Sequence, residues 1–183
     1  MDFKLVFEKL LTAFKEEDIR YALMGGLALG AWGVPRGTVD IDFLVHREDM
    51  TKVDVIMRGL GYEIRNSTEN VSQYISALKI FGEVDFIHAF RSHSLSMLDR
   101  AEDRMFFDGE LTVRVLRIED LIGFKLQAMT NNEKRRALDL YDIETLMAAK
   151  AAEIDWLLVK EYFSLFECDE LYDELKGKYG KNQ

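Results

Sequence analysis

The first part of the chain changes from a helical to a strand-like pattern of apolar positions. Residues 3–14 place apolar side chains three or four positions apart, which predicts an amphipathic helix. A short apolar run at 21–24 predicts a buried strand, which Gly25-Gly26 ends. A helix of small residues is expected over about 27–32, before the breaker cluster 33–37.

The next segment alternates between apolar and acidic positions as a strand does. From Val39 to Val45 every second side chain is apolar, so Asp40, Asp42 and Leu44 share the opposite face. The pattern further predicts a helix over 49–60, strands at about 62–64, 74–81 and 84–87 with a hairpin turn at Gly82-Glu83, and a second hairpin of 105–107 and 111–116 around Asp108-Gly109.

No strand pattern follows Ile118, and only helices are expected from there to about Lys176. The chain is therefore expected to divide into a mixed α/β core, residues 1–117, and a helical C-terminal segment, residues 118–183. Because no Gly/Ser/Pro-rich spacer separates the two, the helical segment is expected to pack on the core. The predicted fold class is α/β (α+β), with a mixed sheet followed by C-terminal helices.

The composition agrees with a folded, soluble protein. Of 183 residues 48% are hydrophobic, and no apolar stretch approaches the roughly 18–20 residues that cross a bilayer. The acidic, amphipathic start is unlike a signal peptide, and the single Cys168 excludes an internal disulfide and cysteine-based zinc clusters. These features predict a cytoplasmic protein that does not associate with membranes.

The formal net charge of −9 argues against a broad basic face for long nucleic acid, but not against a nucleotide carried by Mg²⁺. Asp40 and Asp42 leave one strand face roughly 6–7 Å apart, where their charges repel unless a cation compensates. If the strand that carries Asp85 lies alongside, the three acids can hold Mg²⁺ or Mn²⁺, as two-metal phosphoryl transfer requires. The plainer alternatives are a solvated acidic sheet face and an Asp85 paired with an arginine.

The glycine pair lies between a predicted strand and a predicted helix. Glycine allows the backbone to approach a ligand closely, and a helix N-terminus attracts phosphate, so Gly25 and Gly26 are candidates for nucleotide binding. Arg36 and Thr38 precede the acidic strand and could orient phosphate or an acid. Each of these residues also has a plain interpretation, as a tight turn, a loop arginine and a strand-start threonine.

Three charged residues fall on apolar helical faces of the C-terminal segment. Lys125 lies within the stripe of Ile118, Leu121, Ile122 and Met129, and Asp139 and Asp142 project within the arc of Leu138, Ile143 and Leu146. Acids that face a core require a cationic partner, for which Lys125 and Arg136 are available. A buried ion-pair network that locks the helices is one interpretation of this pattern.

Taken together, these motifs resemble the nucleotidyltransferase superfamily with the DNA polymerase beta-like fold. Its order of strand, Gly-Gly turn, helix, D-x-D strand and third acid is matched by MGGLALGAWGVPRGTVDIDFLV and the later EVDFI. The long spacing before the acidic strand, together with Lys125-Leu-Gln-Ala128 and Arg136-Ala-Leu-Asp139-Leu-Tyr-Asp142, is similar to the AbiEii-like branch, which includes toxin components. The resemblance covers about residues 20–147. The sequence departs from it at Leu27, where the superfamily often has Ser or Thr.

The resemblance implies an enzyme that moves a nucleoside monophosphate from a nucleoside triphosphate to an acceptor hydroxyl. Asp40, Asp42 and Asp85 would be catalytic and bind metal, while Gly25, Gly26, Arg36, Thr38 and Lys125 would bind nucleotide, supported by Arg136, Asp139 and Asp142. The acceptor is left open among RNA, protein and a small molecule, and a small antitoxin-like protein would be a partner in a toxin–antitoxin setting. The alternatives are a catalytically silent nucleotide-binding or regulatory protein, and a metal-dependent phosphohydrolase.

Overall fold

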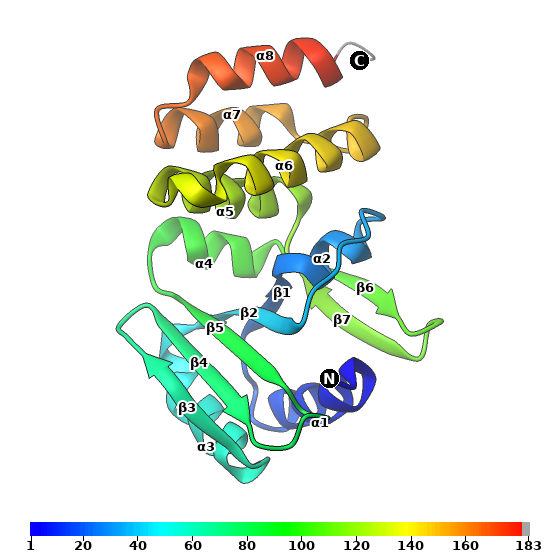
Figure 1. Ribbon diagram of the computed structural model, residues 1–183, viewed down its shortest axis with the longest axis vertical. Helices are drawn as coiled ribbons and strands as arrows, with labels where there is room; N and C mark the ends of the chain where they lie inside the picture. Colours follow the sequence, from blue (N-terminus) through cyan, green and yellow to red (C-terminus); the bar gives the residue numbers. More distant parts are fainter. Residues whose placement is uncertain (181–183) are drawn as a thin grey trace. The chain divides into compact units, whose positions relative to one another are not determined.

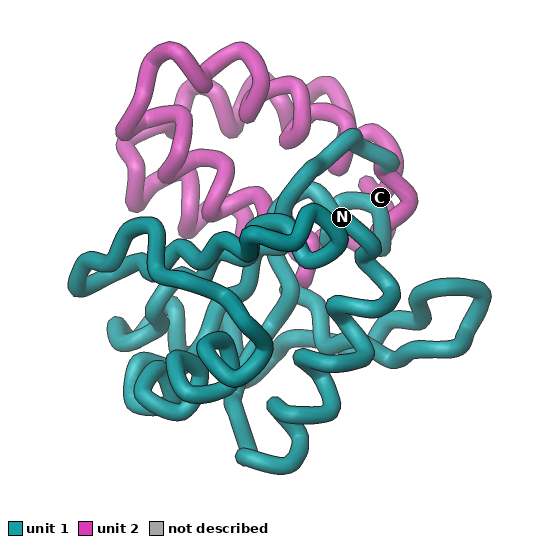
Figure 2. Tube along the Cα trace, turned by 60° about the horizontal axis from the view of Figure 1, so that its bottom comes forward, with its two compact units in different colours: residues 1–31, 35–116 teal, residues 32–34, 117–183 magenta. Residues whose placement is uncertain are grey.

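The computed structural model describes residues 1–180, whose contacts divide the chain into two compact units (Figure 2). The first unit consists of residues 1–31 and 35–116 and contains the seven described strands. The second consists of residues 32–34 and the chain from Arg117 onward, and its regular structure is helical. Within residues 1–180, no helix combines the length and the apolar character that a bilayer crossing requires.

A seven-stranded mixed sheet is the framework of the first unit (Figure 1). Its strand order is β3-β4-β5-β2-β1-β7-β6. β2 runs parallel to β5 and β1 parallel to β7, whereas the other neighbouring pairs are antiparallel. The strands are β1 Tyr21–Met24, β2 Asp40–His46, β3 Tyr62–Ser67, β4 Val71–Ser76, β5 Glu83–Ala89, β6 Glu102–Phe106 and β7 Leu111–Val115.

The two faces of this sheet differ in chemistry because side chains alternate along each strand. Phe43 of β2 and Phe86 of β5 stack with ring centroids 5.8 Å apart, and Phe14 packs against both from one side. The same alternation turns Asp42 and Asp85 to the opposite face. Helices α1 and α3 lie on the aromatic side and α2 and α4 on the acidic side (Figure 1). These helices are α1 Phe3–Glu16, α2 Gly25–Ala31, α3 Met50–Gly59 and α4 Ser92–Asp99, with a 3₁₀ turn η1 at Arg47–Asp49.

The mixed α/β fold is confirmed, but two segments differ from the sequence-based expectation. β4 begins at Val71 and ends at Ser76, so the apolar run 74–81 is not a strand to its end. Leu78 and Ile80 are exposed in the connection to β5, which shows that apolar character alone does not extend a strand. Helix α4 was not predicted. Its sequence is mostly polar, and the hydroxyl of Ser94 accepts a hydrogen bond from the backbone N–H of Arg91 at its start.

The second unit consists of helices joined by short connections. Asp155 caps one of them by accepting hydrogen bonds from the N–H groups of Leu157 and Leu158. The hydroxyl of Tyr162 donates to the buried carboxylate of Asp120 at 2.7 Å, which joins two helices of the unit. The helices are α5 Ile118–Asn131, α6 Arg136–Lys150, α7 Trp156–Leu165 and α8 Asp169–Tyr179, with a 3₁₀ turn η2 at Glu133–Arg135.

Candidate functional site

The parallel pairing of β2 with β5 brings three carboxylates together. Asp42 is the direct register partner of Asp85, and Asp40 is the partner of Glu83. Because residues two apart on a strand share a face, Asp40, Asp42 and Asp85 leave the same side of the sheet. One carboxylate oxygen from each lies within 4.8 Å of the others, and all three residues are half-buried. Acids from two distant stretches of sequence thus form one cluster.

Hydrogen bonds fix the orientation of two acids of this cluster. The Thr38 hydroxyl donates to Oδ1 of Asp40 at 2.6 Å, and the side-chain amide of Gln73 on β4 donates to Oδ2 of Asp85 at 2.7 Å. Oδ1 of Asp85 is buried and has no hydrogen-bond partner within the described chain. An unpaired buried carboxylate oxygen is energetically costly, so this atom calls for a cation or a proton donor.

The electrostatics of Asp85 agree with that requirement. Burial raises the pKa of this carboxyl group above its usual value, because burial disfavours the charged form. The hydrogen bond from Gln73 lowers the pKa, whereas the negative charge of Asp40 raises it further. A divalent cation would reverse this balance, since it stabilises all three carboxylates in their ionised form.

The glycine pair closes one side of the acid cluster. Gly25 has a φ of +68°, and a Cβ at this position would lie only 2.7 Å from Cγ of Asp42. A Cβ at Gly26 would lie 2.9 Å from Cβ of Thr38. A side chain at either position would therefore displace the groups that surround the acids, and only glycine allows the backbone to pass this close.

Arg36 and Leu27 also lie in this part of the chain. Arg36 is half-buried in the connection between α2 and β2, where it already interacts with other groups of the chain. Leu27, the second residue after Gly25, offers no hydroxyl group, so any hydrogen bond from this turn to a phosphate has to come from backbone N–H groups.

In the second unit, Lys125 pairs with two buried acids. Its Nζ atom lies 3.0 Å from Oδ1 of Asp139 and 2.7 Å from Oδ2 of Asp142. The lysine side chain is 10% exposed, and those of Asp139 and Asp142 are 0% and 3% exposed. A second cation, Arg135, places its Nε atom 3.1 Å from Oδ2 of Asp139. Arg136 is exposed at the start of α6. The predicted ion-pair network is therefore present, with Arg135 in the position considered for Arg136.

The sequence relationship agrees with this geometry. A family model described as an uncharacterised nucleotidyltransferase matches residues 4–172. The chain belongs to this nucleotidyltransferase family. No match was found among curated proteins. The AbiEii-like branch and the toxin–antitoxin role stay predictions, because the matching family is described only as a nucleotidyltransferase.

Solved nucleotidyltransferase structures share the fold. The antibiotic-resistance factor ANT(2'')-Ia in solution is 18% identical, with a TM-score of 0.65 over 100% of both chains. The same factor in complex with adenylyl-2''-tobramycin is 16% identical, with a TM-score of 0.68 over 88% of this chain and 97% of that one. The lincosamide antibiotic adenylyltransferase LnuA, bound to lincomycin, is 15% identical, with a TM-score of 0.51 over 79% of this chain and 96% of LnuA. At these identities the likeness concerns the fold alone.

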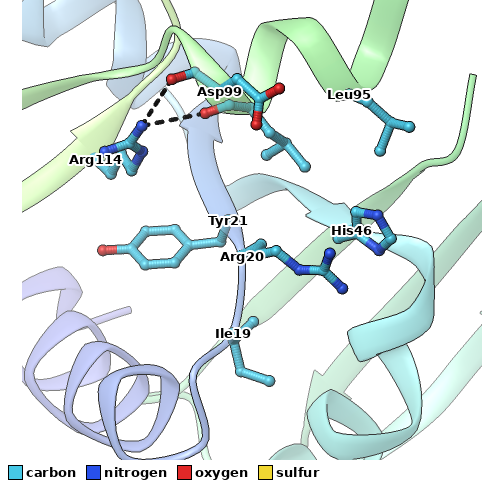
Figure 3. A pocket seen from close by; sticks show the side chains of 8 residues that line it. Ile19, Arg20, Tyr21, His46, Leu95, Asp99 and Arg114 are labelled. Atoms are coloured by element: carbon cyan, nitrogen blue, oxygen red, sulfur yellow. Dashed lines mark hydrogen bonds between the residues drawn. The ribbon is translucent and has the colours of Figure 1, made fainter. Parts of the chain in front are cut away.

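A hollow of about 440 Å³ in this nucleotidyltransferase lies at the other end of β1 and β2 (Figure 3). Its charged groups already serve the fold. Arg114 donates to the carbonyl oxygens of Leu98 and Asp99, where α4 ends, and Arg20 pairs with Asp49. None of the three clustered acids lines this hollow, whose residues are Ile19, Arg20, Tyr21, His46, Leu95, Leu98, Asp99 and Arg114. The candidate site is therefore the acid cluster.

Sequence reasoning missed Gln73. It lies beside Asp85 because β4 and β5 pair in antiparallel register, and that register aligns Gln73 directly with Asp85. The strand prediction began at Tyr74 and left this position outside any element. A single polar residue next to an apolar run carries no signal of a role, since its neighbours across the sheet cannot be read from local sequence.

Proposed function

We propose that the protein transfers a nucleoside monophosphate from a nucleoside triphosphate to an acceptor hydroxyl, with Mg²⁺ or Mn²⁺ held by Asp40, Asp42 and Asp85. The observation that carries this proposal is the convergence of these carboxylates within 4.8 Å beside Gly25. Oxygen donors are the ligands that Mg²⁺ prefers, and the unpaired Oδ1 of Asp85 suits a metal bond. The donor set therefore fits a hard divalent cation.

Each residue of the cluster has a separate task in this proposal. A bound divalent cation would supply charge neutralisation for the triphosphate and would lower the pKa of the acceptor hydroxyl. Gly25 and Gly26 bring backbone N–H groups close to the acids, where they cradle the phosphates. Thr38 holds Asp40 in place through the 2.6 Å hydrogen bond. Asp85 turns Oδ1, the oxygen atom that Gln73 leaves free, toward the cation and the acceptor hydroxyl, and its carboxylate takes the proton that this hydroxyl loses.

The remaining predicted nucleotide contacts have different support. Arg36 is kept as a phosphate contact because it lies four residues before the start of β2, the strand that carries Asp40 and Asp42. Lys125 has weaker support, because its ammonium group is already bound by Asp139 and Asp142. Asp139 and Asp142 are proposed to act only through the stability of the helical unit, in which Arg135 holds the place predicted for Arg136.

A small molecule is the acceptor that the observations favour. ANT(2'')-Ia, for which a complex with adenylyl-2''-tobramycin is known, matches this chain over the full length of both proteins. LnuA is likewise named as an adenylyltransferase of an antibiotic. The net charge of −9 works against RNA, whose phosphates require cationic side chains. We therefore propose a hydroxyl-bearing small molecule, and the acidic charge favours one that carries amines.

One observation favours a second candidate, a catalytically silent nucleotide-binding protein. Leu27 stands where a hydroxyl would help to bind phosphate in related proteins, so backbone groups alone must seat the triphosphate. In that case, triphosphate and metal bind, but no pyrophosphate is released.

Transfer of label from α-³²P-labelled triphosphates tests the proposal. The protein is incubated with each triphosphate, Mg²⁺ or Mn²⁺, and either the small-molecule fraction or the RNA fraction of a cell extract. The expected result is labelled small molecules, equimolar pyrophosphate and a loss of at least a hundredfold in Asp42→Ala. Label in RNA would refute the proposed acceptor, release of labelled monophosphate alone would indicate a phosphohydrolase, and transfer by Asp42→Ala would refute the mechanism.

A further inference from the structure

A row of polar side chains extends the acid cluster across the sheet. Strand register aligns Asn66 of β3 with Gln73 of β4, Gln73 with Asp85 of β5, and Asp85 with Asp42 of β2. Directly paired residues of neighbouring strands project from the same face of a sheet. The row therefore runs from β3, at the edge of the sheet, to the strand that carries the D-x-D acids (Figure 1).

Hydrogen bonds connect the side chains of this row, and each amide donates to the next residue toward Asp85. Nδ2 of Asn66 donates to Oε1 of Gln73 at 3.4 Å, and Nε2 of Gln73 donates to Oδ2 of Asp85 at 2.7 Å. A carboxylate can only accept, so the Gln73 amide must turn its nitrogen to Asp85 and its oxygen to Asn66. The amide of Asn66, which is exposed, donates to that oxygen at 3.4 Å and thereby favours the orientation that Asp85 requires.

The consequence falls on the other oxygen atom of Asp85. With Oδ2 engaged by Gln73, Oδ1 is buried and has no partner within the described residues. Oδ1 is thus the atom left for the cluster with Asp40 and Asp42. Without the Gln73 amide, the carboxylate could rotate about its Cβ–Cγ bond, and its two oxygens would become equivalent.

We propose that Gln73, held by Asn66, is a positioning residue that locks the Asp85 carboxylate so that Oδ1 faces the cation and acceptor site. The inference rests on the proposed function, because it assigns Gln73 a task only if Asp85 binds metal and takes a proton. Hydrogen-bond partners of metal-binding side chains typically contribute 10–100-fold to metal affinity or activity.

Arg65 is a cation near Asp85 that could compete for its carboxylate. Arg65 on β3 forms an ion pair with Glu83 at 2.9 Å and acts on Asp85 by charge without a direct bond. Its side chain is 58% exposed and can change conformation. If Asp85 lost its bond to Gln73, Arg65 would be an alternative partner for the carboxylate, which would draw it away from the cluster.

The test compares Gln73→Met, which keeps the length of the side chain but removes the donor, with Gln127→Met on the exposed side of α5 as a matched control. Binding of Mn²⁺ is measured without substrates, from the electron paramagnetic resonance signal of free Mn²⁺. Transfer kinetics are measured at saturating Mn²⁺, with unfolding curves as a check on the fold. A second variant, Asn66→Ala, keeps the donor but removes the group that orients it.

We expect Gln73→Met to weaken Mn²⁺ binding and to lower kcat by about 10–100-fold each, with the KM for triphosphate nearly unchanged. Asn66→Ala should show the same pattern at a few-fold, and Gln127→Met should match wild type. If wild type binds Mn²⁺ and transfers label while Gln73→Met does so within twofold of it, the positioning role is refuted. If Gln73→Met does not fold, unchanged Mn²⁺ binding and kcat in Asn66→Ala refute it instead. A wild type that neither binds Mn²⁺ nor transfers label refutes the proposed function, and the inference with it.

Discussion

At the scale of single residues, the close approach of Gly25 to Asp42 gives a direct prediction. Gly25→Ala places a methyl group 2.7 Å from Cγ of Asp42, on a backbone with a φ of +68°. We expect the carboxylate to be displaced and label transfer to fall by a hundredfold or more, because small misplacements of catalytic groups are costly. The left-handed backbone conformation adds a loss of about 1–2 kcal/mol in the free energy of unfolding.

Gly30 supplies the control within the same helix. A Cβ at Gly30 meets no atom within 4 Å, and the residue is exposed near the end of α2. Gly30→Ala should keep wild-type transfer and leave stability unchanged or raised by up to about 1 kcal/mol. Equal activity in the two alanine variants would show that the Gly25 turn does not shape the site.

Asp49 gives a prediction on pH. Burial raises its pKa, but hydrogen bonds from the side chain and the backbone of Arg20 outweigh this effect, and the folded pKa is below its usual value. The interaction therefore stabilises the fold fully above the unfolded pKa of about 3.9, and the stabilisation is lost as the pH falls through the folded pKa. Asp49→Asn should cost about 1–3 kcal/mol at pH 7.

Urea unfolding at a series of pH values measures this difference. The difference in the free energy of unfolding between wild type and Asp49→Asn should be constant from pH 7 to 5 and should become smaller between pH 4 and 3. Asp173→Asn, an exposed substitution on α8, should show almost no gap at any of these values. A gap that widens on acidification would contradict the assigned ion pair.

At the scale of elements, the strands with a clear apolar pattern in the sequence form at or near the predicted residues. β1 occupies the expected residues 21–24, and β2 and β5 form around the predicted acidic strands. β4 could not be placed correctly, because the exposed Leu78 and Ile80 imitate a continued strand. The D-x-D pair was recognisable because its spacing is set by one strand. Its meeting with Asp85 was an expectation about pairing, and the contribution of Gln73 depends on a register that only the folded sheet defines.

The pairing of α5 with α6 gives a prediction at this scale. Lys125→Met would leave Asp139 and Asp142 buried without their lysine, and Arg135, 3.1 Å from Asp139, would remain as a cation on that carboxylate. Removal of one partner from a buried ion pair typically costs about 3–5 kcal/mol, and we expect a loss of this size in urea unfolding. Adding Asp139→Asn and Asp142→Asn to Lys125→Met should recover most of the loss, because no buried charge is then left unpaired.

The same variants test the predicted phosphate contact of Lys125. If the lysine serves only the helices, the triple variant should bind triphosphate with an unchanged KM once it is folded. A KM raised tenfold in a stable triple variant would instead assign Lys125 to the nucleotide. A Lys125→Met protein as stable as wild type would contradict the structural role.

At the scale of the whole molecule, the acid cluster that is proposed to bind metal lowers the stability of the fold when no metal is bound. The chain has a net charge of −9, and three of its carboxylates converge within 4.8 Å. Burial first, and the negative charge of Asp40 second, raise the pKa of Asp85, because both disfavour its ionised form. Keeping all three carboxylates ionised in this half-buried site therefore destabilises the fold. A cation that binds only the folded chain offsets the cost, so the stability of the whole protein should depend on divalent metal.

Asp85→Asn should separate these two effects. The asparagine can turn its oxygen to Gln73 and place its neutral amide where Oδ1 lies, so one charge is removed without a change of shape. In EDTA, Asp85→Asn should be more stable than wild type by about 1 kcal/mol, since repulsion within the cluster falls. In millimolar Mn²⁺ the order should reverse, because wild type gains binding free energy that the variant has lost. Thermal unfolding in EDTA measures the effect of charge repulsion, and thermal unfolding in Mn²⁺ measures the gain from metal binding. Asp173→Asn should behave as wild type under both conditions. An equal gain from Mn²⁺ in wild type and Asp85→Asn would mean that the cation binds elsewhere and that these acids are a structural feature of the sheet.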